Sequence, residues 1–120
     1  TINGRPMTMT EIARLFSTGQ FSRIEDALAE AAVWDIIGEQ RIEGAAAVLK
    51  HGRAIEAYFN TVAHEFTVQA VHQCGNTVIV QGQALFRKPD QDSRIAACDI
   101  YAFDDARKLM HIQSYCIAEA

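Results

Sequence analysis

The sequence lacks the cysteine and histidine patterns that mark disulfide frameworks and metal sites. Its three cysteines, Cys74, Cys98 and Cys116, have neither an even count nor paired spacing, which favours free thiols in a reducing compartment. The four histidines show none of the spacings that place two metal ligands on one helix face. We therefore expect a cytoplasmic protein that binds no metal.

Positive charge and long apolar runs are also scarce. The formal net charge is -4 and the 11 lysines and arginines are scattered, so no basic face is available to neutralise nucleic-acid phosphates. No apolar run approaches the ~20 residues of a membrane helix, and the first ten residues, TINGRPMTMT, lack the apolar segment of a signal peptide. These absences predict no nucleic-acid partner and no membrane association, while the missing initiator Met leaves open an upstream segment.

The remaining composition is that of a folded globular protein. Hydrophobic residues make up 49% of the chain and charged residues 22%, which excludes intrinsic disorder. A chain of 120 residues is long enough to bury roughly two thirds of its unfolded surface. Because no repeat, linker or low-complexity segment interrupts it, we expect a single domain over residues 1–120.

Helical signals fill the first half of the chain. Thr8-Met9-Thr10-Glu11 fits a capping box and predicts a helix over residues 8–17. A second capping box begins at Ser22, and apolar residues at helical spacing predict a helix to about residue 31. A third helix is expected over residues 45–63, after a short strand at residues 33–37.

The second half has the alternation of strands. From Glu65 apolar residues recur with a period of two, and turn sequences separate segments at 65–74, 77–86, 95–103 and 109–118. Four strands joined by short turns form an antiparallel meander. The predicted class is therefore α+β, with three N-terminal helices packed on one face of a curved, mainly antiparallel sheet.

Both faces of the strand at residues 95–103 are apolar, whereas a sheet with one solvated face would alternate more cleanly. The three helices cover one face, so we expect a second copy of the chain to cover the other, in a homodimer through the sheet. The predicted dimer surface comprises Ala96, Cys98, Ile100, Ala102, Leu109, Tyr115 and Ile117, with His111 at or near the contact.

Two aspartates stand in apolar surroundings, where a carboxylate must be paired, protonated or close to water. Asp35 lies between Trp34 and Ile36; it is either a strand-end residue that accepts backbone hydrogen bonds or a general base in a pocket. Asp99 lies in the middle of a strand, on the apolar face that includes Tyr101. It either forms an ion pair or hydrogen bond with a neighbour or faces a cavity.

The order of these elements resembles the nuclear-transport-factor-2-like superfamily, a cone-shaped α+β fold that includes ketosteroid isomerases and polyketide-cyclase-like proteins. The resemblance runs from about Glu11 to Cys116 and rests on the pattern W-D-x-x-G…G, the long helix and the ending CDIYAFDDARKLMHIQSY. These motifs are specific for the fold and only weakly specific for an activity, because the fold hosts enzymes and non-enzymes alike.

Within the superfamily, the ketosteroid isomerases imply functional roles for both aspartates. Asp35 falls on the position of their catalytic base, and Asp99 on that of a protonated Asp that donates to the substrate oxyanion. Where they carry a tyrosine on the first helix, this chain has Leu15 or Phe16. The loss of such a donor costs on the order of 3 kcal/mol of transition-state stabilisation, which argues against steroid isomerisation itself.

The resemblance also indicates which residues line the pocket. Alternation along the last strand groups four residues on one face, which the alignment turns inward, and Trp34 and Tyr101 complete the expected lining. Tyr101 is also a candidate for the missing hydroxyl donor. The predicted ligand-binding residues are Trp34, Tyr101, Met110, Ile112, Ser114 and Cys116.

Two functions fit this reading. The first is a cofactor-independent isomerase or lyase that acts by proton transfer on an apolar carbonyl compound, in which Asp35 removes a proton and Asp99 stabilises the enolate oxygen. The second is a non-catalytic module that uses the same cone as an apolar ligand pocket or a dimerisation surface. The absent tyrosine favours the second function, and the two aligned aspartates favour the first.

Overall fold

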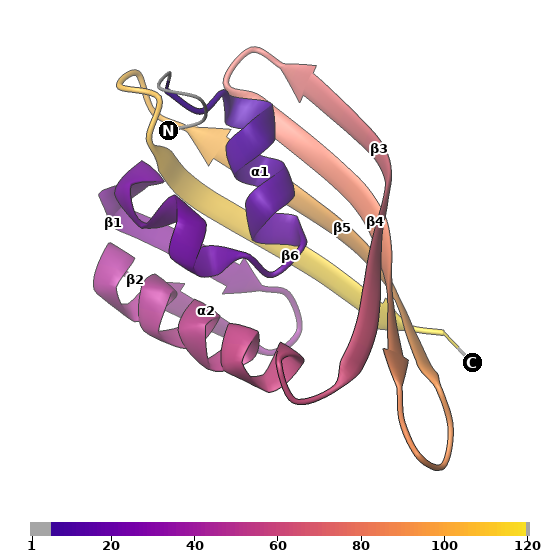
Figure 1. The fold of residues 1–120 in the computed structure, drawn as a ribbon. Helices are drawn as coiled ribbons and strands as arrows, with labels where there is room; N and C mark the ends of the chain where they lie inside the picture. Colours follow the sequence, from indigo (N-terminus) through magenta and orange to yellow (C-terminus); the bar gives the residue numbers. More distant parts are fainter. Residues whose placement is uncertain (1–5, 120) are drawn as a thin grey trace.

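The computed structural model describes residues 6–119 (Figure 1). Residues 1–5, the first half of the segment in which no signal peptide was expected, lie outside the described residues. None of the helices in this part of the chain is long and apolar enough to cross a membrane. The elements in chain order are α1 (Met9–Ser17), η1 (Phe21–Ala27), β1 (Leu28–Ile36), β2 (Gln40–Glu43), α2 (Ala45–Phe59), β3 (Ala63–Cys74), β4 (Thr77–Arg87), β5 (Ser93–Phe103) and β6 (Leu109–Ala118).

Six strands form one curved sheet in the order β2-β1-β6-β5-β4-β3. Neighbouring strands are antiparallel except β1 and β6, which run parallel and join the two halves of the chain. Figure 1 shows α1, η1 and α2 on one face of this sheet. The α+β class and the meander from β3 to β6 are confirmed. The strand expected at residues 33–37 is part of the longer β1, and β2 was not predicted.

The helix predicted from residue 22 to residue 31 is only partly present. The segment forms the short 3-10 helix η1, whose Ile24 has non-helical dihedral angles, and the chain then enters β1 at Leu28. Pairing of β1 with β6 overrides the helical preference of the alanine-rich sequence. The expected second capping box is not used: the Ser22 hydroxyl donates to Glu56 Oε1 of α2 at 2.9 Å, and η1 has no side-chain cap.

Helix α1 begins as predicted. The Thr8 side chain accepts a hydrogen bond from the Glu11 backbone, and the Glu11 side chain accepts one from the Thr8 backbone. This reciprocal capping satisfies two otherwise unpaired N–H groups.

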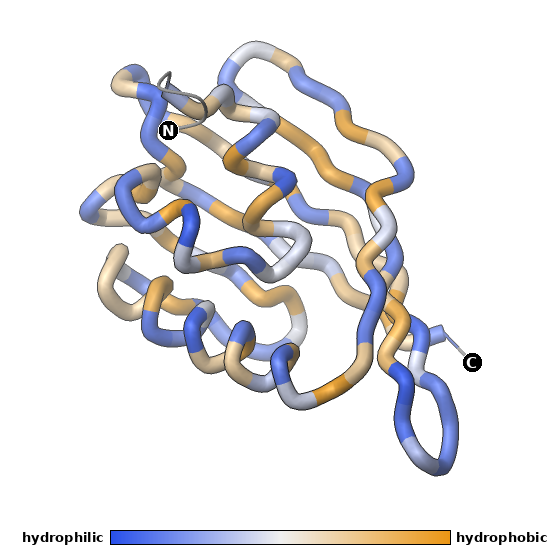
Figure 2. The backbone as a smooth tube through the Cα atoms, in the orientation of Figure 1, coloured by the Kyte–Doolittle hydropathy of each residue, from blue (hydrophilic) through white to orange (hydrophobic). Residues whose placement is uncertain are grey.

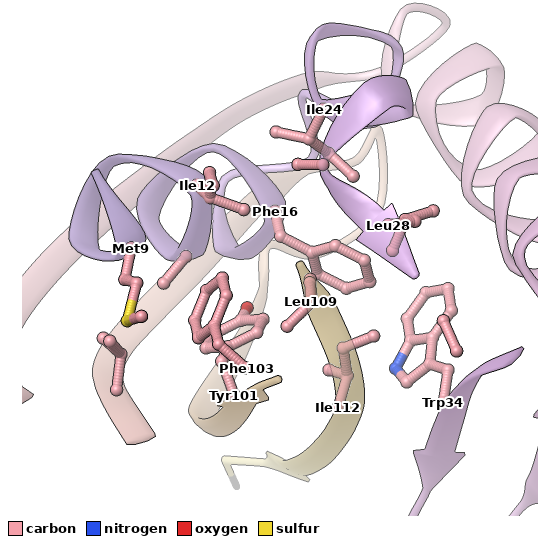
Figure 3. Packing of buried hydrophobic residues seen from close by; sticks show 14 of the residues in the cluster. Met9, Ile12, Phe16, Ile24, Leu28, Trp34, Tyr101, Phe103, Leu109 and Ile112 are labelled. Atoms are coloured by element: carbon pink, nitrogen blue, oxygen red, sulfur yellow. The ribbon is translucent and has the colours of Figure 1, made fainter. Parts of the chain in front are cut away.

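The hydrophobic core lies between the helices and the inner face of the sheet. Figure 3 shows Phe16 of α1 beside Trp34 and Tyr101 of the sheet. The Phe16 ring meets Phe21, Trp34 and Tyr101 edge-on, at centroid distances of 4.8, 4.9 and 5.5 Å, in the favoured geometry of aromatic pairs. Figure 2 shows hydrophobic and hydrophilic residues in alternation along much of the chain, as expected for elements with one buried side.

A β-bulge changes the expected facing of two residues in β6. Ala102 of β5 pairs with His111, but Phe103 pairs with Leu109, so Met110 has no partner across the ladder. Leu109 is therefore fully buried, while Met110 is 44% exposed. The predictions that Met110 faces the pocket and Leu109 the outer surface are wrong because simple alternation does not account for a bulge.

Alanine substitution can test this register. We expect Leu109→Ala to lower the free energy of unfolding by about 2–5 kcal/mol, because it empties a fully buried site. The matched change Met110→Ala should alter it by only about 0.5 kcal/mol, as at other surface positions. Urea denaturation of the two variants measures the difference, and a larger loss for Met110→Ala would contradict the bulge.

Candidate functional site

A cavity of about 380 Å³ opens between α1, α2 and the inner face of the sheet. Its volume is in the lower part of the range of about 300–1,000 Å³ typical of small-molecule sites. Aromatic side chains from helices and strands supply much of its wall: Phe16, Phe21, Trp34, Phe59, Phe66 and Phe86. The cavity is thus suited to an apolar molecule of modest size.

Strand register decides which side chains reach this cavity. Asp99 pairs with Ser114, and Ser114 pairs with Ile36 on its other side. Side chains directly opposite in a ladder point to the same face, and all three residues line the cavity. The row places a carboxyl group and a hydroxyl group side by side on an otherwise apolar floor.

Asp35 faces away from the cavity, because it follows the inward-facing Trp34 and alternation turns it to the outer face of the sheet. There its Oδ2 lies 2.7 Å from His111 Nε2, and its Oδ1 lies 3.5 Å from Arg41 Nη1. The expectation that Asp35 and Asp99 open into one cavity is therefore wrong. Asp35 lies near the end of its strand, as the alternative interpretation expected, but its partners are the side chains of His111 and Arg41 rather than the backbone N–H groups that this interpretation proposed.

Asp99 is buried, with 8% of its surface exposed. The Ser17 hydroxyl, at the end of α1, donates to Asp99 Oδ2 at 2.8 Å, and it also forms a hydrogen bond with the Tyr101 hydroxyl. When Asp99 is ionised, Tyr101 must be the donor in the second bond, since the one Ser17 proton points to the carboxylate. A chain of hydrogen bonds thus runs from the Tyr101 hydroxyl through the Ser17 hydroxyl to the Asp99 carboxyl group.

Ser114 adds a further hydroxyl to this polar end of the cavity. Trp34 Nε1 donates to Ser114 Oγ at 2.9 Å, and Ser114 is buried. Because the Ser114 oxygen accepts from the indole, its own proton is free to interact with Asp99. The same hydrogen bond holds the Trp34 indole, which lines the cavity, in one orientation.

Burial raises the pKa of Asp99 above its ordinary value of 3.8, while hydrogen bonds from Ser17, Ser114 and Tyr101 oppose the shift. Burial, together with the Asp99 charge, places the pKa of Tyr101 well above its ordinary value. Burial also raises the pKa of the Cys116 thiol to about 11, with Asp99 and Glu39 adding to the effect. At neutral pH Tyr101 and Cys116 keep their protons, so neither serves as a ready base or nucleophile.

The six predicted pocket residues occupy four kinds of position. Trp34, Ser114 and Cys116 line the cavity with Asp99, and Tyr101 adjoins it through Ser17. Ile112 is fully buried in the core, and Met110 lies on the surface. Functional roles for the lining residues stay predictions.

Ser17 is the site residue that the sequence reasoning missed. It follows Phe16 and stands four residues after the fully buried Ala13, so helical spacing places it on the same side of α1 as Ala13. That spacing was available in the sequence, but the identity of its partner on β5 was not. Ser17 supplies from α1 the hydroxyl that Leu15 and Phe16 lack.

The raised pKa of Asp99 predicts how stability depends on pH. A folded-state pKa above the unfolded value means that the stabilising contribution is complete below about 3.8 and is lost as pH rises through the folded pKa. We expect the wild type to lose stability relative to Asp99→Asn over this interval and the difference to become constant above it. Near pH 7 Asp99→Asn should be at least as stable as the wild type.

Urea denaturation between pH 3 and pH 8 measures this difference, since other titrating groups cancel between the two proteins. Ser17→Ala, compared with Ser17→Ala/Asp99→Asn, removes a hydrogen bond that lowers the pKa. In this second pair, the stability difference should become constant only at a higher pH than in the first pair, because the pKa of Asp99 is higher without Ser17. A difference that does not vary with pH would mean that Asp99 is solvated in the folded state.

Comparisons with other proteins agree with the fold. The chain matches the profile of the SnoaL-like domain over residues 9–110, and no curated protein matches it significantly. An NTF2-like protein of unknown function from Cytophaga hutchinsonii is 27% identical, with a TM-score of 0.83 over 90% of this chain and 95% of that chain.

Two more distant structures are similar in fold alone. An LEH-like epoxide hydrolase from M. tuberculosis is 15% identical, with a TM-score of 0.64 over 87% of this chain and 75% of that one. A candidate SnoaL-like polyketide cyclase from Shewanella denitrificans is 13% identical, with a TM-score of 0.71 over 94% and 92% of the respective chains. Because the family profile covers most of the sequence, this chain belongs to the SnoaL-like domain family of the NTF2-like superfamily.

Proposed function

We propose that the cavity binds a small, mainly apolar carbonyl compound and that Asp99 transfers a proton on it without a cofactor. One observation carries this proposal: a buried carboxyl group with a raised pKa stands at the polar end of an apolar cavity, in contact with a serine hydroxyl. Perturbed carboxyl groups in clefts are frequent at catalytic sites.

The wall favours a ligand that is apolar over most of its surface. Each square ångström of apolar surface removed from water contributes roughly 25 cal/mol, and aromatic rings from α1, η1, α2 and three strands are available to cover it. An oxygen atom on the ligand can accept a hydrogen bond at the Asp99 end, from the protonated carboxyl group or from Ser17 once its proton turns away from Asp99. This end of the cavity therefore fixes the orientation of the ligand.

With Asp35 on the outer face, Asp99 takes the role of base in this proposal. Of the two carboxyl groups that line the cavity in the described part of the chain, Glu39 is exposed and Asp99 is buried. The ionised Asp99 removes the proton α to the carbonyl and returns it to the same or another carbon. A raised pKa suits this task, because a general base works best with a pKa near the operating pH.

Ser17 gives the negative charge of the enolate a partner. Before the transfer its proton points to Asp99. Once Asp99 is protonated, the carboxyl no longer needs this donor, and the Ser17 hydroxyl can turn its proton to the enolate oxygen while it still accepts from Tyr101. The same three groups thus serve both the removal of the proton and the stabilisation of the product.

A non-catalytic ligand-binding protein is the alternative. It is favoured by Leu15 and Phe16, the two positions that match the hydroxyl donor of ketosteroid isomerases, because neither side chain can donate and both pack in or against the core. The fold itself does not decide between the two, since one fold hosts many functions. The two functions differ in whether a bound ketone exchanges its α-protons.

Proton exchange of trans-2-decalone in D2O, followed by NMR, separates them. We expect the wild type to accelerate exchange of the α-protons, and Asp99→Asn to reduce this acceleration by about 10²–10⁴-fold, the usual contribution of a general base. Ketone binding is measured from the fluorescence of Trp34, the single tryptophan of the chain, which lines the cavity. Asp35→Asn is the matched control and should exchange like the wild type, because Asp35 faces outward.

Binding of the ketone by both the wild type and Asp99→Asn, without acceleration by either, would establish the non-catalytic alternative. Acceleration that survives in Asp99→Asn and is lost in Asp35→Asn would reverse the assignment of the base.

We further propose that a second copy of the chain covers the outer face of the sheet. Cross-strand pairing puts Ile79 beside Ile100 and Cys98 beside Tyr115 on this face, and the helices lie on the opposite face (Figure 1). Tyr115 is 39% exposed and Ile117 is 68% exposed. His111 belongs to this face through its bond with Asp35, whereas Leu109 belongs to the core. An apolar surface of this kind usually marks an association site.

Sedimentation at low micromolar concentration should give a mass near twice the 13.3 kDa of the chain. We expect Ile100→Lys to shift the protein toward monomer, because it places a charge at the centre of the outer face. Ala57→Lys, on the exposed side of α2, should leave the mass unchanged. A wild type that sediments as a monomer at high concentration would exclude this dimer.

A further inference from the structure

His51 is a polar residue of the cavity wall that the proposed reaction leaves unused. It lies on α2, is half-buried and lines the same cavity as Asp99. Its ring meets the indole of Trp34 edge-on at a centroid distance of 5.3 Å. Within residues 6–119 neither of its ring nitrogens has a hydrogen bond or ion pair, so both are available to a ligand.

Other polar groups of the wall differ from His51 in one of two ways. Ser17 and Ser114 already have partners in the protein. Glu39 and Thr67 have no side-chain partner among the described residues, but both are exposed, so water can satisfy them. An apolar molecule that displaced water from the half-buried His51 would leave a ring N–H unpaired, which is costly.

Trp34 sets the separation between His51 and the Asp99 end. One part of its indole packs against the His51 ring, and its Nε1 donates to Ser114, the strand partner of Asp99. The indole therefore stands between the two polar groups along one wall. A ligand that follows this wall meets a hydrogen-bonding group at each end of the apolar stretch that the indole forms.

We infer that the cavity selects compounds with an oxygen function at both ends of an apolar ring system. One oxygen binds at Asp99 and Ser17, and the other accepts from or donates to a ring nitrogen of His51. This inference rests on the proposed function and specifies its ligand class. A monoketone fills the apolar part but leaves His51 without a partner.

Two saturated bicyclic ketones test the inference: trans-2-decalone, with one carbonyl group, and trans-decalin-2,6-dione, with one on each ring. Titrations followed by Trp34 fluorescence should give the wild type about a three- to tenfold lower Kd for the dione, the usual effect of one added hydrogen bond. His51→Phe keeps a ring against Trp34, so the preference should disappear while the Kd for the monoketone stays within about twofold.

Three further measurements control for folding and for general effects. His51→Gln retains an amide that can hydrogen-bond and should keep part of the preference, which serves if His51→Phe does not fold. His72→Phe, at an exposed position of β3, should bind both ketones as the wild type does. In the unaltered protein, the dione and the monoketone should give different ring-nitrogen shifts for His51, because only the dione supplies a hydrogen-bonding partner.

Equal affinities of the wild type for the two ketones would overturn the two-ended ligand while leaving the Asp99 cavity intact. The same holds if His51→Phe weakens both ketones equally. If the wild type bound neither ketone, both this inference and the proposed ligand class would fail. Normal binding of the dione with no proton exchange would remove the catalytic proposal alone.

Discussion

The parallel pairing of β1 with β6 determines the chemistry of the cavity. It sets Trp34 opposite Ile112 and Ile36 opposite Ser114, so the indole faces the helices and Asp35 faces outward. A slip of one residue would exchange Trp34 and Asp35, burying a carboxylate in the core and exposing the indole to water. The large cost of this exchange fixes the register, and with it the contact from Trp34 to Ser114 and the polar end at Asp99.

Asp99 is a local conflict within an otherwise consistent fold. Its burial disfavours the charged form, and the hydroxyl groups of Ser17, Ser114 and Tyr101 offset only part of that effect. An apolar side chain of similar size would satisfy the core without any such network. Proteins tolerate local destabilisation where function requires it, so the arrangement is easier to explain by a ligand than by folding alone.

Features that depend on neighbours along the chain could be predicted from the sequence, and features that depend on pairing across the sheet could not. The capping box at Thr8 and the meander from β3 to β6 follow local patterns, and both are present. The helix expected at residues 22–31 is replaced from Leu28 onward by β1, because β1 forms hydrogen bonds with β6. The strand register determines which face of the sheet the Asp35 side chain points to, and a β-bulge determines this for Met110. The partner of Ser17 is known only once α1 lies over β5.

The geometry also limits the kind of proton transfer that this site can perform. A mechanism with two separate carboxyl groups can remove a proton on one side of a substrate and supply one on the other. Here Asp35 is on the far face of the sheet, while Asp99 and Ser17 lie at one end of the cavity and Tyr101 is hydrogen-bonded to Ser17. If Asp99 both removes and returns the proton, the transfer must take place on a single face of the enolate plane. That constraint follows from the fold before any substrate is known, because the register that turns Asp35 outward leaves one carboxyl group in the cavity interior.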